Sequence, residues 1–253
     1  MNISLLGYGK MGKAVEAAIA SSGEHTVVSH FNRTSALTPD VFQSADVIIE
    51  FTTGEAFIGN LSTLVKSGKP VIVGTTGWAS VMETVKREVE ASNTLLLYAS
   101  NFSLGVHLFF RLVKEAAALV NTLDGFDVAL SEVHHTAKAD VPSGTALRAA
   151  ELVLAELDRK TALRTGLEPN GGKTAADELL VSSLRLGKVF GEHTLHIDSE
   201  SDDLTLTHRA KDRSGFAKGS LAAAVWLAEE YQRGSRGVLT MDDFLAGRLK
   251  PKS

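Results

Sequence analysis

Cysteine is absent from the 253 residues of this sequence. Its absence excludes a disulfide framework, a thiolate nucleophile and a zinc site with cysteine ligands. The sequence also has no His-Glu-x-x-His pattern, no internal repeat, no low-complexity segment and no apolar run long enough to span a bilayer. Because a predicted strand already begins by Ile3, there is no room for a signal peptide, and we expect a cytosolic location.

Neither sign of charge dominates. The formal net charge is −4 at pH 7, which does not favour nucleic acid or an anionic membrane as a partner. Hydrophobic residues make up 44% of the chain and charged residues 22%, values ordinary for a globular protein with a substantial core. A chain of 253 residues has room for one large domain or two modest ones.

A glycine-rich motif follows the first predicted strand. Residues 1–6 form this strand, Gly7-Tyr-Gly-Lys-Met-Gly12 comes next, and residues 13–22 follow as a predicted helix. In this context the G-x-G-x-x-G pattern predicts dinucleotide binding. Gly7 makes the tight turn, Gly9 lets the backbone approach a pyrophosphate, and Gly12 permits close helix–strand packing. Without that context, a plain glycine turn would be the better interpretation.

The end of the second predicted strand, residues 25–31, bears on the choice between NADPH and NADH. An acidic residue there would bind the ribose hydroxyls of NAD. The sequence has Asn32 instead, followed by Arg33, Thr34 and Ser35, which suit a 2′-phosphate. We therefore expect NADPH to be preferred over NADH. Alternatively, Arg33 is a surface arginine that stacks on adenine and discriminates little.

Three more predicted strands, residues 45–51, 71–73 and 94–98, also run directly into polar or glycine-rich turns. These turns are Glu50-Phe-Thr-Thr53, Gly74-Thr-Thr-Gly77 and Ala99-Ser-Asn-Phe102. Predicted helices at 54–67 and 81–91 separate the strands. Because open parallel sheets bind ligands at the carboxyl ends of their strands, the four turns predict one shared site in a Rossmann-type, doubly wound domain.

Titratable side chains gather in Glu132-Val-His-His-Thr-Ala-Lys-Ala-Asp-Val-Pro-Ser-Gly-Thr-Ala146, between a predicted strand at 126–130 and a predicted helix at 146–157. Extended backbone would point His134 and His135 in different directions, whereas coiled backbone would place His134 and Lys138 on one side. An imidazole and an ammonium aimed at one point suit an anionic substrate that must also receive a proton. The Ser143-Gly144-Thr145 segment is typical of a helix cap and first turn, which can bind a carboxylate or phosphate.

A simpler interpretation of this segment is a polar loop with a capped helix and two solvated histidines. A metal site is not expected, because a lysine among the histidines would repel a cation.

The rest of the second half predicts a smaller α+β domain with a mixed sheet. Residues 104–123 and 216–233 have helical patterns, and residues 165–176, which include Pro169-Asn-Gly-Gly172, form a glycine-rich loop. Alternating runs at 180–186, 193–199 and 204–208 predict strands. We expect His193 and His208 to shape this sheet rather than to do chemistry. The predicted domains are 1–103 with 214–253 for the dinucleotide, and 104–213 for the substrate.

The pattern Glu132-x-His-His-x-x-Lys-x-Asp-x-Pro-Ser-Gly-Thr-Ala146 resembles the signature of 4-hydroxy-tetrahydrodipicolinate reductases, also called dihydrodipicolinate reductases. Other segments are similar to this family as well. They are the glycine loop, which is one residue longer in many members, Gly74-Thr-Thr-Gly77, Ala99-Ser-Asn-Phe102, Arg185-x-Gly187 and Gly237 to Leu245. The resemblance therefore runs nearly from end to end.

The resemblance implies an NAD(P)H-dependent reduction of 4-hydroxy-tetrahydrodipicolinate to tetrahydrodipicolinate in lysine and diaminopimelate biosynthesis. It implies that His134 is the proton donor or acceptor and Lys138 the second acid, and that the substrate's carboxylates are held by His135, Ser143, Gly144 and Thr145. The residues implied to bind NADPH or NADH are Gly7, Tyr8, Gly9, Lys10, Met11, Gly12, Asn32, Arg33, Gly74, Thr75, Thr76, Ala99, Ser100, Asn101 and Phe102. It further implies a homotetramer assembled through the sheets of the second domain.

Two other functions stay open. One is a related dehydrogenase for another amino-acid-derived substrate, such as an aspartate dehydrogenase. Such an enzyme should lack the complete His-His-x-x-Lys and Pro-Ser-Gly-Thr set. The other is a non-catalytic nucleotide sensor, which would bind NADPH tightly without turnover.

Overall fold

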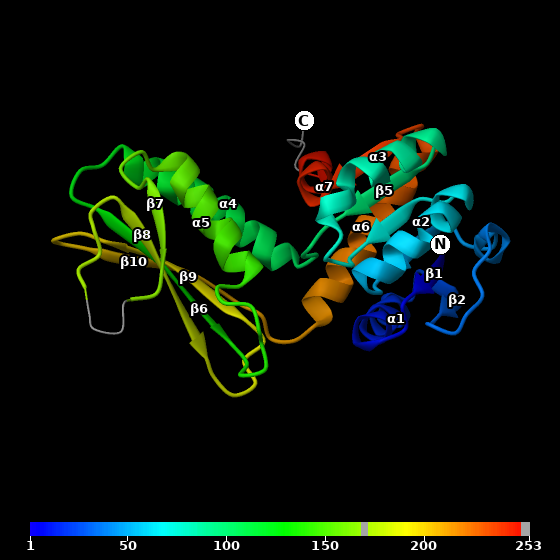
Figure 1. The fold of residues 1–253 in the computed structure, drawn as a ribbon, viewed down its shortest axis with the longest axis horizontal. Helices are drawn as coiled ribbons and strands as arrows, with labels where there is room; N and C mark the ends of the chain where they lie inside the picture. The colour runs from blue at the N-terminus through cyan, green and yellow to red at the C-terminus, as the bar shows by residue number, and fades with distance from the viewer. Residues whose placement is uncertain (168–171, 249–253) are drawn as a thin grey trace. The chain divides into compact units, whose positions relative to one another are not determined.

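The structure is a computed structural model that describes residues 1–167 and 172–248 (Figure 1). The chain forms two compact units. Unit 1 comprises Met1–Ser103 and the chain from Arg213 onward, and unit 2 comprises Leu104–Asp212. The sequence-based division ends the second domain at residue 213, one residue later than the end of unit 2 in the structure. Much of the predicted loop at 165–176, including Pro169, lies outside the described residues.

Unit 1 contains a six-stranded parallel sheet; the sequence predicts five of its strands, and the sixth, β11 (Gly237–Thr240), was not predicted. The strands are β1 (Asn2–Leu6), β2 (Thr26–Phe31), β3 (Val47–Glu50), β4 (Val71–Val73), β5 (Leu95–Tyr98) and β11 (Gly237–Thr240), in the order β11-β5-β4-β3-β1-β2. Strands β3 and β4 are buried on both faces, whereas the edge strand β2 alternates between exposed and half-buried residues. This contrast follows from their places in the sheet, because helices cover both faces of a parallel sheet.

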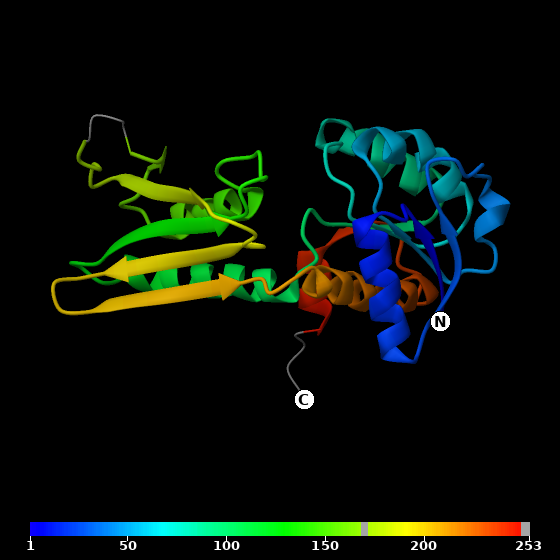
Figure 2. The same ribbon diagram turned by 90° about the horizontal axis from the view of Figure 1, so that it is seen from below.

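The helices of unit 1 are α1 (Lys10–Ser22), α2 (Gly54–Lys66), α3 (Met82–Ala91), α6 (Ser214–Gln232) and α7 (Met241–Arg248), with short 3-10 turns η1 (Pro39–Phe42) and η2 (Ala79–Val81). Two hydrophobic cores form, one on each face of the sheet. Residues of α1, α6 and α7 fill one core, and residues of α2 and α3 fill the other (Figure 2). The doubly wound arrangement is thus confirmed.

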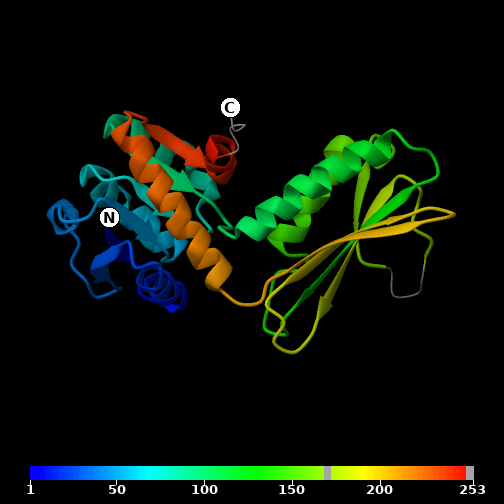
Figure 3. The ribbon, with the colours of Figure 1, turned by 180° about the vertical axis from the view of Figure 1, so that it is seen from behind.

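Unit 2 is an α+β unit with a five-stranded mixed sheet. Its strands are β6 (Asp127–His134), β7 (Ala162–Thr165), β8 (Glu178–Arg185), β9 (Glu192–Asp198) and β10 (Asp203–Arg209), in the order β10-β9-β6-β8-β7. Strand β6 is parallel to β8 and antiparallel to β9. Helices α4 (Leu104–Asn121) and α5 (Gly144–Glu156) cover one face and supply the core with the inward residues of the sheet (Figure 3).

Two features of unit 2 differ from the sequence-based expectation. Strand β7 was not predicted, and β6 continues to His134 rather than ending at Leu130. The inward positions of β6 are Val128, Leu130, Glu132 and His134, so its buried face changes from apolar to polar toward its carboxyl end. That end of the strand holds the candidate site. No helix in the described parts of the chain is long and apolar enough to cross a membrane.

Candidate functional site

The turns at the carboxyl ends of the unit 1 strands lie side by side. Backbone hydrogen bonds continue across the sheet beyond the strands: the N–H groups of Gly7, Phe51, Gly74 and Ala99 each donate to the carbonyl of the last residue of the neighbouring strand, at 2.8 to 3.1 Å. The four turns singled out in the sequence therefore share one edge of the sheet. This edge is where parallel sheets bind ligands.

The glycine loop needs glycine for steric reasons that the structure makes plain. Gly7 has a φ of +93°, and a Cβ there would lie 2.1 Å from the carbonyl oxygen of Phe51. A Cβ on Gly12 would lie 2.2 Å from the oxygen of Gly7. Gly9 caps helix α1 and faces open space, so its bare backbone is accessible to a ligand. Because α1 begins at Lys10, three residues earlier than predicted, its unpaired N–H groups open directly behind the loop, as a phosphate site requires.

A pocket of about 430 Å³ adjoins this loop, a size typical of small-molecule sites. Its lining comes from three turns and the start of α2: Leu6, Gly7, Tyr8, Gly9, Asn32, Arg33, Ser35, Leu37, Phe51, Thr52, Thr53, Ala56 and Asn60. The glycine loop, the open space over Gly9 and a nearby arginine fit a dinucleotide phosphate. Of the predicted cofactor residues, five line this pocket: Gly7, Tyr8, Gly9, Asn32 and Arg33. The residues Lys10, Met11 and Gly12 and the turns at 74–76 and 99–102 do not line it.

The turn after β2 presents Arg33 to the pocket. The Oδ1 atom of Asn32 accepts hydrogen bonds from the Thr34 N–H at 3.0 Å and the Thr34 hydroxyl at 2.8 Å, which order the turn. Arg33 is exposed and has no hydrogen bond or ion pair to any residue that the structure describes. Its charge is therefore available to an anion. Tyr8 stacks on His30 with ring centroids 4.3 Å apart, and its hydroxyl donates to Glu16.

A buried glutamate joins the turns after β3 and β4. The Glu50 carboxylate accepts hydrogen bonds from the Thr52 N–H and the Thr75 hydroxyl, both at 2.8 Å. Burial raises the pKa of Glu50 above its ordinary value, and the bonds from Thr52 and Thr75 offset only part of that effect. Gly74 packs so closely that a Cβ there would lie 2.0 Å from the Phe51 ring.

The predicted cofactor residues in the last two turns differ in exposure. Thr76 and Ser100 are exposed, Asn101 is half-buried, and Thr75 uses its hydroxyl inside the protein. Ala99 and Phe102 belong to the hydrophobic core. Their side chains therefore support the turn, and only their backbone is placed to meet a ligand.

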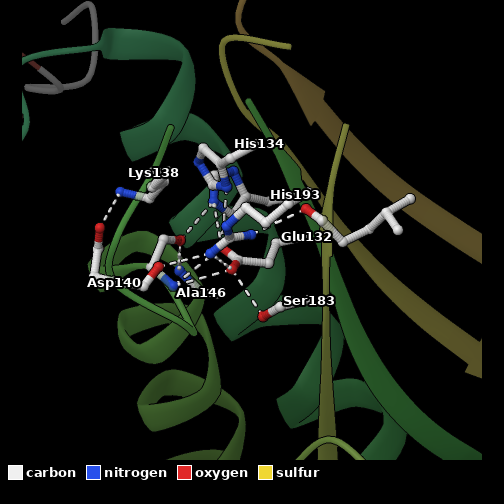
Figure 4. A network of polar contacts seen from close by, with 10 residues as sticks. Glu132, His134, Lys138, Asp140, Ala146, Ser183 and His193 are labelled. Atoms are coloured by element: carbon white, nitrogen blue, oxygen red, sulfur yellow. Dashed lines mark hydrogen bonds and ion pairs between the residues drawn. The ribbon is translucent and has the colours of Figure 1, made fainter. Parts of the chain in front are cut away.

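In unit 2 the polar cluster is organised around Glu132 (Figure 4). Its side chain has no solvent exposure and accepts hydrogen bonds from three residues, which lie on β8 and at the start of α5. The Ser143 N–H donates to both carboxylate oxygens at 3.1 Å, the Ser183 hydroxyl donates at 2.8 Å, and Arg185 donates from Nη2 at 3.1 Å. Burial alone would raise the pKa of Glu132, but these bonds outweigh it and hold the pKa below its ordinary value.

His134 lies next to this carboxylate on the same face of β6. Its Nδ1 is 3.3 Å from Oε2 of Glu132, and its ring centroid is 5.0 Å from that of His193. Burial lowers the pKa of His134, the Glu132 carboxylate raises it, and Lys138 and Arg185 lower it again. The pKa therefore lies below the ordinary value, which leaves a group that loses its proton readily.

His135 and Lys138 follow on the turn after β6. His135 is half-buried and directly follows the last residue of β6. A turn brings the Lys138 N–H to the His135 carbonyl at 3.1 Å. The Lys138 ammonium forms an ion pair with Asp140 at 2.8 Å, and this pair keeps the pKa of Asp140 below its ordinary value.

The start of α5 confirms the predicted cap but changes the interpretation of Ser143. Its hydroxyl accepts from the Ala146 N–H at 3.2 Å and also pairs with Nε2 of His193 at 3.1 Å. Its own N–H is bound to Glu132, and its side chain is buried. Ser143 thus links three elements internally, whereas Gly144 is exposed and Thr145 half-buried in the first turn of α5.

Sequence reasoning missed the participation of His193 and Arg185 in this cluster. The ring of His193 stacks loosely on His208 at 6.5 Å, and burial lowers the pKa of His193 to about 4, with further lowering from His134 and His208. His193 reaches the cluster because it is paired with Glu132 across β6 and β9, and Arg185 because it is paired with His134 across β6 and β8. No local sequence pattern reveals these cross-strand pairs.

The same cluster contains the atoms of a possible cation site. Glu132, His134 and His193 offer ligand atoms within 4.8 Å of one another. The carboxylate, however, already binds Arg185 and the Ser143 N–H, and Lys138 adds positive charge nearby. We assign no metal here, because a cation would have to displace these partners or be repelled by them.

A dinucleotide-type parallel sheet with a glycine loop, together with a second unit that carries an acid–base cluster, defines a class: the two-unit nicotinamide-dependent oxidoreductases. Family sequence profiles identify which family of this class the chain belongs to. The profile for the dihydrodipicolinate reductase N-terminus matches residues 1–102, and the profile for its C-terminus matches residues 105–245. This chain belongs to the dihydrodipicolinate reductase family, whose members are also named 4-hydroxy-tetrahydrodipicolinate reductase.

Individual relatives agree with this assignment. The 4-hydroxy-tetrahydrodipicolinate reductase of Christiangramia forsetii is 34% identical over 250 residues, which cover 99% of this chain and 100% of the relative. That of Methanopyrus kandleri is 36% identical over 210 residues, covering 83% of this chain and 74% of the relative. The dipicolinate-bound dihydrodipicolinate reductase from Paenisporosarcina sp. TG-14 has the same fold, with a TM-score of 0.74 at 20% identity, covering 95% of this chain and 97% of that one.

Proposed function

We propose that this protein reduces 4-hydroxy-tetrahydrodipicolinate to tetrahydrodipicolinate, with loss of water, using NAD(P)H. The observation that carries this proposal is the intact cluster at the end of β6, in a chain whose two units both match the family. The lysine and diaminopimelate pathway is the setting that the family implies. A cytosolic location suits such a biosynthetic reaction.

The unit 2 cluster suits a cyclic dianion. Lys138, His135 and the first turn of α5 supply positive charge or N–H donors at one end of β6. The structural relative from Paenisporosarcina sp. TG-14 was solved with dipicolinate, an aromatic ring with two carboxylates. In this protein we assign carboxylate binding to His135, Gly144 and Thr145. Ser143 acts indirectly, because its hydroxyl and N–H are already bound within the protein.

His134 is the proposed proton donor and Lys138 the second acid. When bound, the nicotinamide supplies a hydride to the substrate ring. The protein must then supply a proton and keep the ring oriented. His134 has a lowered pKa and lies beside Lys138, which combines a labile proton with a fixed positive charge.

The activity can be tested with substrate generated in situ from pyruvate and aspartate semialdehyde by the upstream synthase. Oxidation of NADPH or NADH that depends on both this protein and the substrate would support the reductase. A folded protein that binds NADPH and oxidises neither cofactor would overturn the proposal and favour a nucleotide sensor. Oxidation with aspartate-derived substrates alone would favour a related dehydrogenase.

For the cofactor we propose a preference for NADPH through Arg33, supported by its exposure beside the pocket and by its lack of a partner among the described residues. In Arg33→Ala, the KM for NADPH should rise about tenfold while the KM for NADH changes by less than about twofold, because only NADPH carries the 2′-phosphate. Arg87→Ala, on α3, is a matched control that should alter neither. Equal increases for both cofactors would contradict the 2′-phosphate role.

We also propose a homotetramer built through the unit 2 sheets. The sheet face opposite α4 and α5 carries cross-strand pairs of apolar side chains, Ala129 with Leu180 and Val133 with Leu184. Leu184, near the end of β8, is 54% exposed in the single chain, a large fraction for a leucine in a strand. Light scattering coupled to size exclusion would measure the mass, and a monomer at micromolar concentration would contradict the assembly.

A further inference from the structure

The two nitrogens of the His134 ring have different surroundings. Nδ1 is fully buried and has no well-formed hydrogen bond to the described residues, and Glu132 Oε2 lies 3.3 Å away from it. Nε2 is not fully buried, and it faces Gly191, where an added Cβ would lie only 2.9 Å from it. Glycine at position 191 therefore leaves space beside Nε2. Nδ1 is thus enclosed and Nε2 is the less enclosed nitrogen, although the His134 side chain as a whole is only 8% exposed.

The enclosed side faces a negative charge that the protein holds in place. Glu132 keeps its charge because Arg185, Ser183 and the Ser143 N–H all donate to it. These partners come from β8 and from the start of α5, so the carboxylate cannot move without breaking contacts to two elements. A carboxylate fixed beside Nδ1 favours the tautomer that carries its proton on Nδ1, and it also stabilises the imidazolium.

The second buried histidine does not compete for this charge. Nε2 of His193 pairs with the Ser143 hydroxyl at 3.1 Å and lies 3.7 Å from Glu132 Oε2. The pKa of His193 is held at about 4, so His193 is neutral at neutral pH. Glu132 is thus left as an electrostatic partner of Arg185 and His134.

We propose that Glu132 is the positioning residue for proton transfer by His134. It holds Nδ1–H and leaves Nε2 as the nitrogen that delivers the proton to the substrate. The inference rests on the proposed reductase function and adds a residue to it. The step balances as follows: substrate, NAD(P)H and one proton give tetrahydrodipicolinate, NAD(P)⁺ and water. The proton leaves Nε2 of the imidazolium, which becomes neutral and is reprotonated from solvent, and Glu132 stays ionised throughout.

The charged groups around His134 set the direction of the expected changes. Glu132 and Asp140 raise its pKa, whereas Lys138 and Arg185 lower it, and the neutral His193 lies against the ring. Glu132→Gln should therefore lower the pKa of His134 by about one unit, and Lys138→Met should raise it. The neutral ring in Glu132→Gln should also lose its preference for the Nδ1–H tautomer.

The test is a ¹⁵N NMR titration of the histidine rings in the full chain without substrate, with the His134 signal assigned by its loss in His134→Asn. Glu132→Gln, Glu132→Asp and the matched carboxylate control Glu178→Gln, on the same sheet, are compared with the wild type. Glu132→Asp should keep most of the wild-type pKa and tautomer, and Glu178→Gln should keep both. An unchanged His134 titration in a folded Glu132→Gln would overturn the proposal. If Glu132→Gln does not fold, loss of the Nδ1–H tautomer in a folded Glu132→Asp, which keeps the carboxylate, would overturn it instead.

The pH dependence of kcat/KM adds a second measurement. In Glu132→Gln, kcat/KM at pH 7.5 should fall about 100-fold, and its alkaline limb should move to lower pH, because His134 loses its proton earlier. A merely structural role would lower kcat/KM equally at every pH, and that result would contradict the proposal. If the wild type has no reductase activity, the proposed function fails, while the ring titration still decides whether Glu132 controls His134.

Discussion

The two units each place a buried glutamate at their functional edge, and the two glutamates differ in their partners. Glu50 in unit 1 and Glu132 in unit 2 both lie near the carboxyl end of a buried strand, with 0% and 1% exposure. Among the described residues, Glu50 accepts hydrogen bonds only from threonine hydroxyl and backbone groups, and its pKa is raised by burial. Glu132 also receives Arg185, and its pKa is lowered.

The comparison shows that burial by itself does not decide the charge of an acid. Both carboxylates lose their hydration, which costs several kcal/mol for an ion in a protein interior, of the order of 3–5 kcal/mol. At Glu50, hydrogen bonds from neutral donors offset part of this free-energy cost. At Glu132, hydrogen bonds from Arg185, Ser143 and Ser183 offset more of it. Unit 1 therefore joins its turns with hydrogen bonds, and unit 2 maintains a fixed charge beside the proposed proton donor, His134.

The largest expected effect is on stability when each glutamate is truncated. Glu132→Ala should destabilise unit 2 by about 3–5 kcal/mol, because the partly buried Arg185 loses its counter-charge. Glu50→Ala should cost unit 1 about 1–2 kcal/mol, since it removes neutral hydrogen bonds and leaves a small cavity. Both tryptophans, Trp78 and Trp226, lie in unit 1, so their fluorescence reports on that unit alone.

Hydrogen exchange of peptides covering β6, β8 and β9 reports on unit 2 in the same experiment. Equal losses of stability for the two variants, or a larger loss for Glu50→Ala, would show that the Arg185 cation does not account for the difference between the two glutamates.

An intermediate effect is expected from glycines that touch each site. Gly191→Ala places a Cβ 2.9 Å from Nε2 of His134 and should lower kcat about tenfold, because the ring must move from its position. Gly74→Ala places a Cβ 2.0 Å from the Phe51 ring and should raise the KM for the cofactor about tenfold through the displaced turn. Gly59→Ala, where an added Cβ has open space, is the control.

Steady-state kinetics, with the cofactor and the substrate varied in turn, distinguishes the expected change in kcat of Gly191→Ala from the expected change in cofactor KM of Gly74→Ala. A Gly191→Ala enzyme with normal kcat, or a Gly74→Ala enzyme with a normal cofactor KM, would remove the corresponding glycine from the site.

The smallest expected effect is that the contributions of the two glutamates to stability depend on pH in opposite directions. Glu132 has a lowered pKa, so its contribution to stability is present above the ordinary glutamate pKa and is lost as pH falls through the lowered value. Glu50 has a raised pKa, so stability is lost as pH rises from the ordinary value through the raised one. Glu50→Gln should therefore be more stable than the wild type by about 1 kcal/mol at pH 8 and no more stable at pH 4.

Tryptophan fluorescence during urea unfolding at the two pH values measures this difference. A Glu50→Gln protein that is less stable than the wild type at both would mean that Glu50 is ionised and well stabilised in the folded state.

Much of unit 1 could be predicted because its signals are local. Short apolar strands, each followed at once by glycine or threonine, give both the parallel sheet and the edge where its turns meet. The start of α1 was placed three residues late, since Lys10 and Met11 were assigned to the loop. The cap at Ser143 was predicted from the Ser-Gly-Thr pattern, and the structure confirms it.

The cluster in unit 2 depends on contacts between distant residues, which a single sequence does not reveal. Glu132 and His134 interrupt the apolar alternation of β6, so the strand was ended too early at Leu130. The strand continues because β8 supplies Arg185, 53 residues away in sequence, to balance the Glu132 charge. His193 was assigned to the sheet alone for the same reason: its proximity to Glu132 follows from the register of β9.

Because side chains alternate between the two faces of the sheet along β6, the number of residues in this strand determines which face His134 occupies. The side chains of Glu132 and His134 face the buried side of the sheet. Inserting or deleting one residue between Asp127 and Val133 would turn the His134 side chain to the opposite face, away from His193 and the start of α5. An even-numbered change would keep the faces, at the cost of a shift along β8. Relatives of this chain should therefore differ within this strand by substitution or by pairs of residues, and a single-residue indel there should mark a protein that has lost the reaction.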